Sequence, residues 1–183
     1  MKIILLLLIS STIWAQNEKS GVYLTFSDYN NNALAFENNC ATDKNAIKLN
    51  ELFNEPSITI AQGNKKIKLR KDSIYGVSLC NQPLTRFQDG EHFHLAEKGL
   101  IWIFYKEVAV PEGKLSRMDR HYYFSATGDG KLLALNADNL KFTFPSNHKL
   151  HDMLDLYSQN SLVQYDTFHK MYRANHFLQE SLK

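Results

Sequence analysis

The clearest structural signal in this chain lies in residues 84–106, LTRFQDGEHFHLAEKGLIWIFYK. Three runs rich in apolar residues are separated there by two turn signals, Asp89-Gly90 and Lys98-Gly99. Links this short require antiparallel strands, because a parallel pair needs a crossover of about a dozen residues or more. The stretch therefore predicts three neighbouring strands of an antiparallel meander.

The same strand-and-turn rhythm continues on both sides of this stretch. Further strands are expected over residues 22–26, 57–61, 66–70, 73–79, 121–126 and 131–135. Residues 28–32 are rich in Asn and are expected to form a loop, and the segment from there to Pro56 shows no clear period. A meander of eight or nine strands should curl into a barrel or a strongly bent sheet, because either shape covers one face and protects the edges.

Near residue 146 the pattern changes from the alternation of strands to the period of helices. Apolar residues from Leu150 to Tyr157 recur at i, i+3, i+4 and i+7, and Ser146 or Asn147 can cap the helix that they define. A second helix is expected over residues 161–181, because its first four residues, SLVQ, fit a capping box. The predicted fold class is α+β, mainly β, with an antiparallel meander followed by two C-terminal helices.

The first fifteen residues, MKIILLLLISSTIWA, have the layout of a secretory signal peptide. Lys2 precedes an apolar run, and the small residue Ala15 lies at the expected cleavage point, where no cysteine is present to carry a lipid anchor. The apolar run is well short of the roughly 20 residues that span a membrane. We therefore expect residues 16–183 to form a single exported domain, periplasmic or extracellular, with no transmembrane segment after removal of the signal peptide.

The composition argues for a folded domain and against a nucleic-acid partner. Hydrophobic residues make up 44% of the chain, which is enough to build a core. The net charge is only +2, and loss of Lys2 with the signal peptide brings it closer to zero. Nucleic-acid-binding domains carry a strong basic field instead.

Cys40 and Cys80 are the only two cysteines. Export makes a disulfide chemically feasible, and closing the loop between them would contribute roughly 4 kcal/mol in the chain-entropy model. However, Cys40 lies in a polar segment, whereas Cys80 follows an apolar run and could be a buried thiol. The sequence leaves both states open, with separate thiols as the preferred interpretation.

The motif with the most chemical promise is Glu91-His92-Phe93-His94. His92 and His94 would point to the same face of a strand and could chelate one metal ion, with His121 from a later strand as third ligand. The His-x-His pair resembles the metal-binding strand of cupins and of alpha-type carbonic anhydrases, which implies a transition metal such as zinc. Alternatively, Phe93 takes the core face and both histidines lie in solvent.

No other motif of the sequence defines a catalytic site. His169 and His176 lie two turns apart on the second predicted helix, too far apart to share a metal without further ligands. The chain has no Gly-x-Ser-x-Gly, His-Glu-x-x-His or Cys-x-x-Cys motif and no glycine loop for phosphate. An enzymatic function is therefore the less favoured hypothesis, and no cofactor is expected apart from the metal considered above.

The overall layout leads to two functional hypotheses. Gly21-Val22-Tyr23 on the first strand, followed by a meander and a late helix, resembles lipocalin-like barrels, and a signal peptide before a β-rich domain is similar to small exported bacterial proteins. Aromatic residues near Trp102 and Tyr122 could line a cavity or pack in the core. We expect an exported non-catalytic binding or envelope-associated module, whose partner is a small apolar ligand or an envelope protein. The alternative is a metal-dependent enzyme that uses the His-x-His site.

Overall fold

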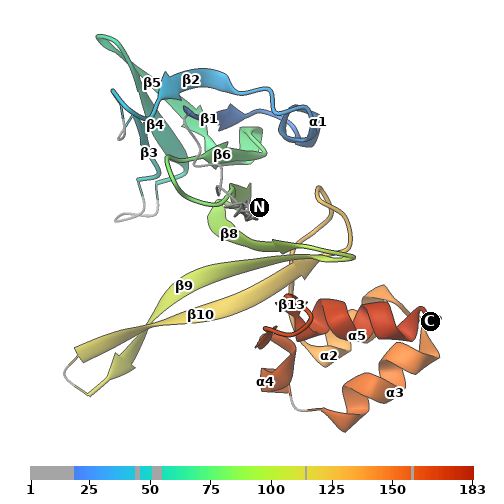
Figure 1. Ribbon diagram of the computed structural model, residues 1–183. Helices are drawn as coiled ribbons and strands as arrows, with labels where there is room; N and C mark the ends of the chain where they lie inside the picture. Colours follow the sequence, from blue (N-terminus) through green and yellow to red (C-terminus); the bar gives the residue numbers. More distant parts are fainter. Residues whose placement is uncertain (1–18, 44–45, 51–54, 114, 158) are drawn as a thin grey trace, which may run out of the picture.

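The computed structural model describes residues 19–43, 46–50, 55–113, 115–157 and 159–183 (Figure 1). The predicted signal peptide, residues 1–15, lies outside these ranges and stays a prediction. Within the described ranges, no helix has the length and apolar character that crossing a bilayer requires.

An eight-stranded antiparallel sheet organises the fold, in the order β11-β10-β9-β8-β7-β6-β1-β2. Its strands are β1 Lys19–Tyr23, β2 Ala35–Asn39, β6 Gly76–Ser78, β7 Thr85–Gln88, β8 Glu91–Lys98, β9 Trp102–Glu112, β10 Leu115–Ser125 and β11 Leu133–Ala134. From β6 to β11 each strand pairs with the next one in the chain, which confirms the meander and the α+β, mainly β fold class.

The sheet is open, because β2 and β11 form its two edges. The barrel alternative is therefore wrong for the described residues, and the likeness to lipocalin-like barrels does not extend to closure. A second, three-stranded sheet covers part of the open one; its strands are β3 Ile47–Lys48, β4 Ser57–Gln62 and β5 Lys65–Arg70, followed by the 3-10 turn η2 Lys71–Ser73. Ile58 and Ile60 of β4 share a core with Val22, Val77 and Phe87 of the large sheet.

Cys40 and Cys80 form a disulfide, with their Cα atoms 5.6 Å apart. Cys40 directly follows β2 and Cys80 lies two residues after β6, and both strands flank β1. The bridge therefore connects the chain on the two sides of β1. Separate thiols, the preferred interpretation of the sequence, are therefore wrong. The sequence could not show the bridge because the two cysteines are brought together by the order of the strands in the sheet, which is a long-range property.

A β-bulge in β8 changes the face of the sheet to which the side chains of its last residues point. The register with β9 shifts between Leu95 and Glu97, so that Ala96 has no partner of its own. Glu97 pairs with Ile103, and its side chain is thereby turned toward the C-terminal helices. The following residue, Lys98, points to the opposite face.

The C-terminal helices cover one face of the sheet (Figure 1). They are α2 Ala137–Thr143, α3 His148–Leu156, α4 Gln159–Leu162 and α5 Arg173–Ser181. Leu140 of α2, Leu150 of α3 and Phe177 of α5 pack with Ile103 and Phe124 of the sheet in one core. Burying side chains of this size contributes about 1.5–3 kcal/mol each.

The expected helix over residues 161–181 is wrong in its first half. α4 ends at Leu162, and the chain then forms a hairpin from β12 Tyr165–Asp166 and β13 Met171–Tyr172 before α5 begins. Long-range hydrogen bonds take the place of helical ones, because the backbone N–H of Tyr172 donates to Glu97, 75 residues earlier. The other predicted helix is α3, which Asn147 caps as expected, but α2 precedes it and starts before residue 146.

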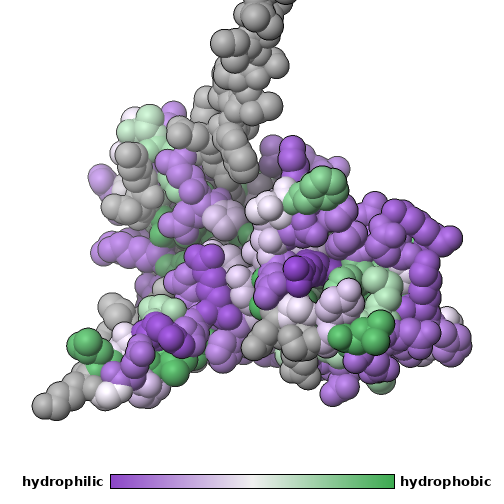
Figure 2. Space-filling view, turned by 60° about the horizontal axis from the view of Figure 1, so that its bottom comes forward, coloured by the Kyte–Doolittle hydropathy of each residue, from purple (hydrophilic) through white to green (hydrophobic). Residues whose placement is uncertain are grey.

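Two further elements differ from the predicted bounds. The first strand ends at Tyr23, and residues that were expected as strand and loop form the short helix α1 Phe26–Asn30, with a capping box between Thr25 and Asp28. β9 and β10 are longer than predicted and project from the sheet as a two-stranded arm (Figure 1). Leu115 and Met118 on this arm are exposed, and Figure 2 shows hydrophobic residues at the lower left, where the arm projects from a mainly hydrophilic face.

Candidate metal centre

The predicted metal site on β8 is only half assembled. His92 and His94 do point to the same face, with ring centroids 5.5 Å apart, and both are half-buried. Nδ1 of His94 lies 3.1 Å from the hydroxyl of Thr85 on the neighbouring strand β7.

His121 does not join this pair. His94 lies opposite Tyr105, and Tyr105 lies opposite Tyr122, so these three side chains share one face of the sheet. Because side chains alternate along a strand, the neighbouring His121 points to the other face. The three predicted ligands therefore cannot surround one ion in this structure.

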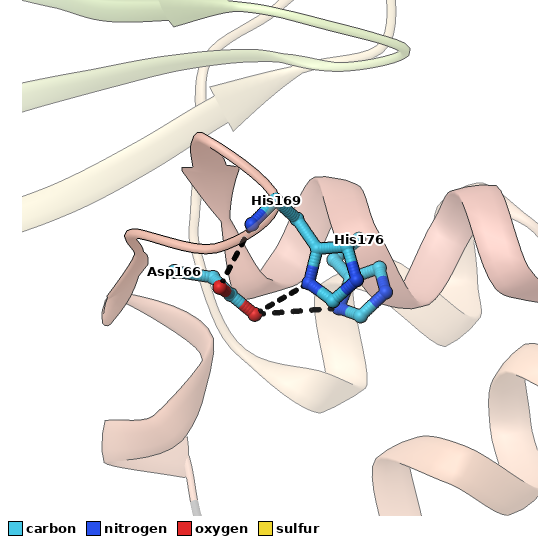
Figure 3. A group of neighbouring side chains, drawn as sticks. All are labelled: Asp166, His169 and His176. Carbon is cyan, nitrogen blue, oxygen red and sulfur yellow. Dashed lines mark hydrogen bonds and ion pairs between the residues drawn. The ribbon is translucent and has the colours of Figure 1, made fainter.

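A different group of side chains has the spacing of metal ligands. Asp166, His169 and His176 each offer one ligand atom, and these atoms all lie within 4.8 Å of one another. Asp166 ends β12, His169 lies in the turn of the hairpin, and His176 lies in the first turns of α5. Figure 3 shows the two imidazole rings overlapping beside the carboxylate. Their centroids are 3.8 Å apart.

The distances between these atoms are close to those of a coordination shell. Oδ2 of Asp166 lies 2.8 Å from Nδ1 of His169 and 3.8 Å from Nδ1 of His176. In a tetrahedral zinc site with bonds of about 2.0–2.1 Å, two ligand atoms are about 3.4 Å apart. The two separations from Asp166 are thus close to this spacing, and all three ligand atoms lie within 4.8 Å of one another.

Asp166 is held in its ionised form by several donors. Nδ1 of His169 donates to Oδ2, and the backbone N–H groups of His169 and Phe168 donate to Oδ1 at 3.0 and 2.9 Å. These bonds, that from the His169 ring above all, lower the pKa of Asp166 to about 2. An anionic oxygen and two imidazoles form a ligand set that suits zinc and related transition metals.

Glu180 extends the site on the far side of His176. Its Oε1 lies 3.6 Å from Nε2 of His176 and 2.6 Å from Nζ of Lys183. Glu180 thus places a second carboxylate beside His176, at ion-pair distance but beyond hydrogen-bonding reach.

The sequence did not reveal this group because it depends on the interrupted helix. On one continuous helix, His169 and His176 would be two turns apart, as the sequence predicts, and no motif singles out Asp166. The hairpin turns the chain back, with Lys170 in a left-handed conformation at φ 56°, and places His169 against His176. The one local signal is the pair Asp166 and His169, whose spacing suits a turn in which the Asp side chain accepts backbone N–H groups.

The structure also contains an apolar hollow of about 660 Å³. It lies between the turn that joins α2 to α3 and the end of α5, and neither Trp102 nor Tyr122, which the sequence allowed in a cavity or in the core, lines it. Phe144, Pro145, Leu178, Leu100 and Leu182 contribute to its walls. Its volume lies in the range of clefts that bind small molecules, about 300–1,000 Å³.

No family model, no curated protein and no solved structure matches this chain.

Proposed function

We propose that this protein is an exported, non-catalytic binding module that holds a divalent transition metal such as zinc at Asp166, His169 and His176. The observation that carries this proposal is the placement of three ligand atoms within 4.8 Å of one another by residues from a hairpin and a helix.

Export is supported by two independent features. The first fifteen residues have the pattern of a secretory signal peptide. The disulfide between Cys40 and Cys80 is typical of proteins that work in an oxidising compartment outside the cytoplasm.

The protonation states of the ligands support metal binding. An ionised carboxylate can only accept a hydrogen bond, so Nδ1 of His169 carries the proton that lies between it and Asp166. A metal ion would take the place of this proton, and the neutral ring would then carry its proton on Nε2. The bound ion would have one anionic and two neutral ligands from the protein, with water in the remaining position.

The binding function has more support than the metal-dependent enzyme suggested by the His-x-His motif. That enzyme needs His121 as third ligand, and His121 points to the opposite face of the sheet from His94. The cluster around Asp166 lies at the surface, where His169 is exposed, and this position suits uptake and release of an ion.

The test is a titration of metal-free protein with zinc, in which isothermal calorimetry measures binding. We expect one zinc ion per chain, and loss of this binding in His176→Ala and in His169→Ala. His121→Ala is the matched control, because it removes an exposed histidine outside the cluster and should leave binding unchanged. Unchanged binding in both cluster variants, or loss of binding in His121→Ala, would contradict the proposal.

Binding of a small apolar ligand is a second candidate, favoured by the hollow beside α5. A fluorescent apolar dye should bind there, and Leu182→Asp should weaken its binding because it places a charge on the wall. Leu156→Asp is the control, since Leu156 is also exposed but does not line the hollow. Equal dye binding by the two variants would exclude this site.

A further inference from the structure

A polar hollow of about 370 Å³ lies on the other face of the sheet, far in sequence from the metal cluster. Its walls come from β1, α1, the segment after β6 and the end of β8. The side chains that matter for recognition are two phenols, three amides and one ammonium group, contributed by Tyr23, Tyr29, Asn30, Asn32, Gln82 and Lys98.

The ammonium group of Lys98 is held by aromatic rings. Its Nζ lies 4.2 Å from the ring centroid of Tyr29 and 4.9 Å from that of Trp102. The two rings meet edge to face, with centroids 5.8 Å apart, and Phe26 of α1 packs against the same Trp102. Cation–π contacts restrain the lysine but leave its donors available for a ligand.

Lys98 makes no ion pair with any carboxylate of the described residues. The nearest acidic residue in the chain, Glu97, is turned to the opposite face by the bulge at Ala96. There it accepts hydrogen bonds from the backbone of Tyr172 and the side chain of Asn175. The positive charge at the hollow is therefore not neutralised by the neighbouring residue, and burial lowers the pKa of Lys98.

The other groups of the hollow suit a ligand with hydroxyl groups. The hydroxyl of Tyr23 donates to Oδ1 of Asn32 at 3.1 Å, which directs the amide nitrogen of Asn32 away from Tyr23. Asn30 and Gln82 add amides that can both donate and accept. Amides and phenols beside an aromatic face match the alternating hydroxyl and C–H groups of a sugar ring, because the hydroxyls can hydrogen-bond to the former and the C–H groups can pack on the latter.

We propose that this hollow binds an acidic sugar, with its carboxylate on Lys98 and its ring hydroxyls on the amides of Asn30, Asn32 and Gln82. The volume is within the range of small-ligand sites. The charge-assisted hydrogen bond to Lys98 sets the preference for an acid, and the amides set the preference for a polyhydroxylated ring.

The experiment is a titration of the full protein with glucuronate in metal-free buffer, in which NMR chemical shifts or calorimetry measure binding. Glucose, which lacks the carboxylate, should bind at least about tenfold more weakly, and so should succinate, which lacks the ring hydroxyls. Glucose or succinate that binds as well as glucuronate would overturn the proposal, as would a lack of glucuronate binding.

Two variants test the named contact. Lys98→Met keeps much of the aliphatic side chain but removes the charge, and should weaken glucuronate binding at least about tenfold without weakening glucose binding. Lys131→Met, which changes an exposed lysine outside the hollow, should bind glucuronate like the unchanged protein. Equal losses of glucuronate affinity in the two variants would show a general effect of charge and would overturn the proposed contact with Lys98. Thermal unfolding of both variants checks that they are folded.

Discussion

Asn175 and Glu97 join the last helix to the sheet, although 78 residues separate them in the chain. The amide nitrogen of Asn175 donates to Glu97 and to the carbonyl oxygen of Ile101 at 3.0 Å, and its amide oxygen accepts from the N–H of Ile101 at 2.9 Å. Asn175 is only 3% exposed. The buried side chain of Asn175 thus hydrogen-bonds to the backbone N–H and C=O groups of Ile101 in the β8–β9 turn. It also holds the carboxylate of Glu97, which the bulge turns toward α5.

The first prediction concerns the removal of this side chain. Asn175→Ala leaves the N–H group of Ile101 buried without its partner, while the C=O group keeps the bond from the N–H of Gly99, and should lower the free energy of unfolding by about 3 kcal/mol in a urea titration. Asn31→Ala removes only an exposed amide and should change it by less than about 0.5 kcal/mol. Similar losses of unfolding free energy in the two variants would contradict a stabilising role for the contacts of Asn175.

The second prediction uses the close approach of Gly99 to the same asparagine. A Cβ added at Gly99 would clash with the side-chain amide of Asn175, so Gly99→Ala should destabilise the protein by about 1–3 kcal/mol. In the Asn175→Ala background, the same change should have a much smaller effect, because the clashing amide is gone. A double-mutant cycle measures this coupling. Additive effects of the two changes would show that the glycine matters for another reason.

The third prediction concerns the disulfide beside β1. Replacing both Cys40 and Cys80 by Ser should lower the free energy of unfolding by roughly 4 kcal/mol, because the unfolded chain regains the freedom of the open loop. Urea titration of the oxidised protein and the double variant measures the difference. A thiol assay on denatured, unreduced protein is the direct check, and detection of two free thiols would disprove the bridge.

The fourth prediction follows from the proposed metal centre. Zinc that binds only the folded protein should stabilise it by about 2.7 kcal/mol at a hundredfold excess over Kd, which raises Tm by roughly 5–10 °C for a chain of this size. His176→Ala should abolish the zinc-dependent rise in Tm, whereas His121→Ala should keep it. A rise of the same size in both variants would locate the zinc elsewhere.

The fifth prediction concerns alkaline pH. Burial raises the pKa of Tyr29 to about 12, and burial also raises the pKa values of Tyr75, Tyr172 and Tyr23. The unfolded phenols ionise near pH 10, so this stabilisation is complete below about pH 10 and is lost as pH rises toward 12.

Urea titrations between about pH 9 and pH 12 test this alkaline loss of stability. The free energy of unfolding should fall over that interval, and Tyr29→Phe, which removes one of the shifted groups, should make the fall smaller. An unfolding free energy that does not change with pH over the same interval would contradict the prediction.

Much of the sheet could be predicted because its signals are local. The turns Asp89-Gly90 and Lys98-Gly99 and the alternation around Phe93 depend only on neighbouring residues, and they predicted β7, β8 and the start of β9 within a few residues. The cap of α3 at Asn147 is local in the same way. The helix expected over residues 161–181 is wrong in its first half. The local capping pattern favours a helix there, but the chain instead forms a hairpin in which the N–H of Tyr172 donates to the distant carboxylate of Glu97.

The candidate site shows the same division more sharply. The pairing of His92 with His94 on one face follows from strand geometry alone, but the position of His121 depends on strand register, which turns it away. The group of Asp166, His169 and His176 requires a turn that breaks a predicted helix.

Local chemistry was therefore enough to establish the meander and the α+β class, since turn residues and alternation act over a few positions. The open sheet, the Cys40–Cys80 bridge and the ligand cluster depend on contacts between residues that are tens of positions apart. Such contacts depend on which apolar side chains can be buried together and on whether buried polar groups such as Asn175 find partners, because an unpartnered polar group in the core is unfavourable. That requirement fixes which segments meet, and no short pattern in the chain expresses it.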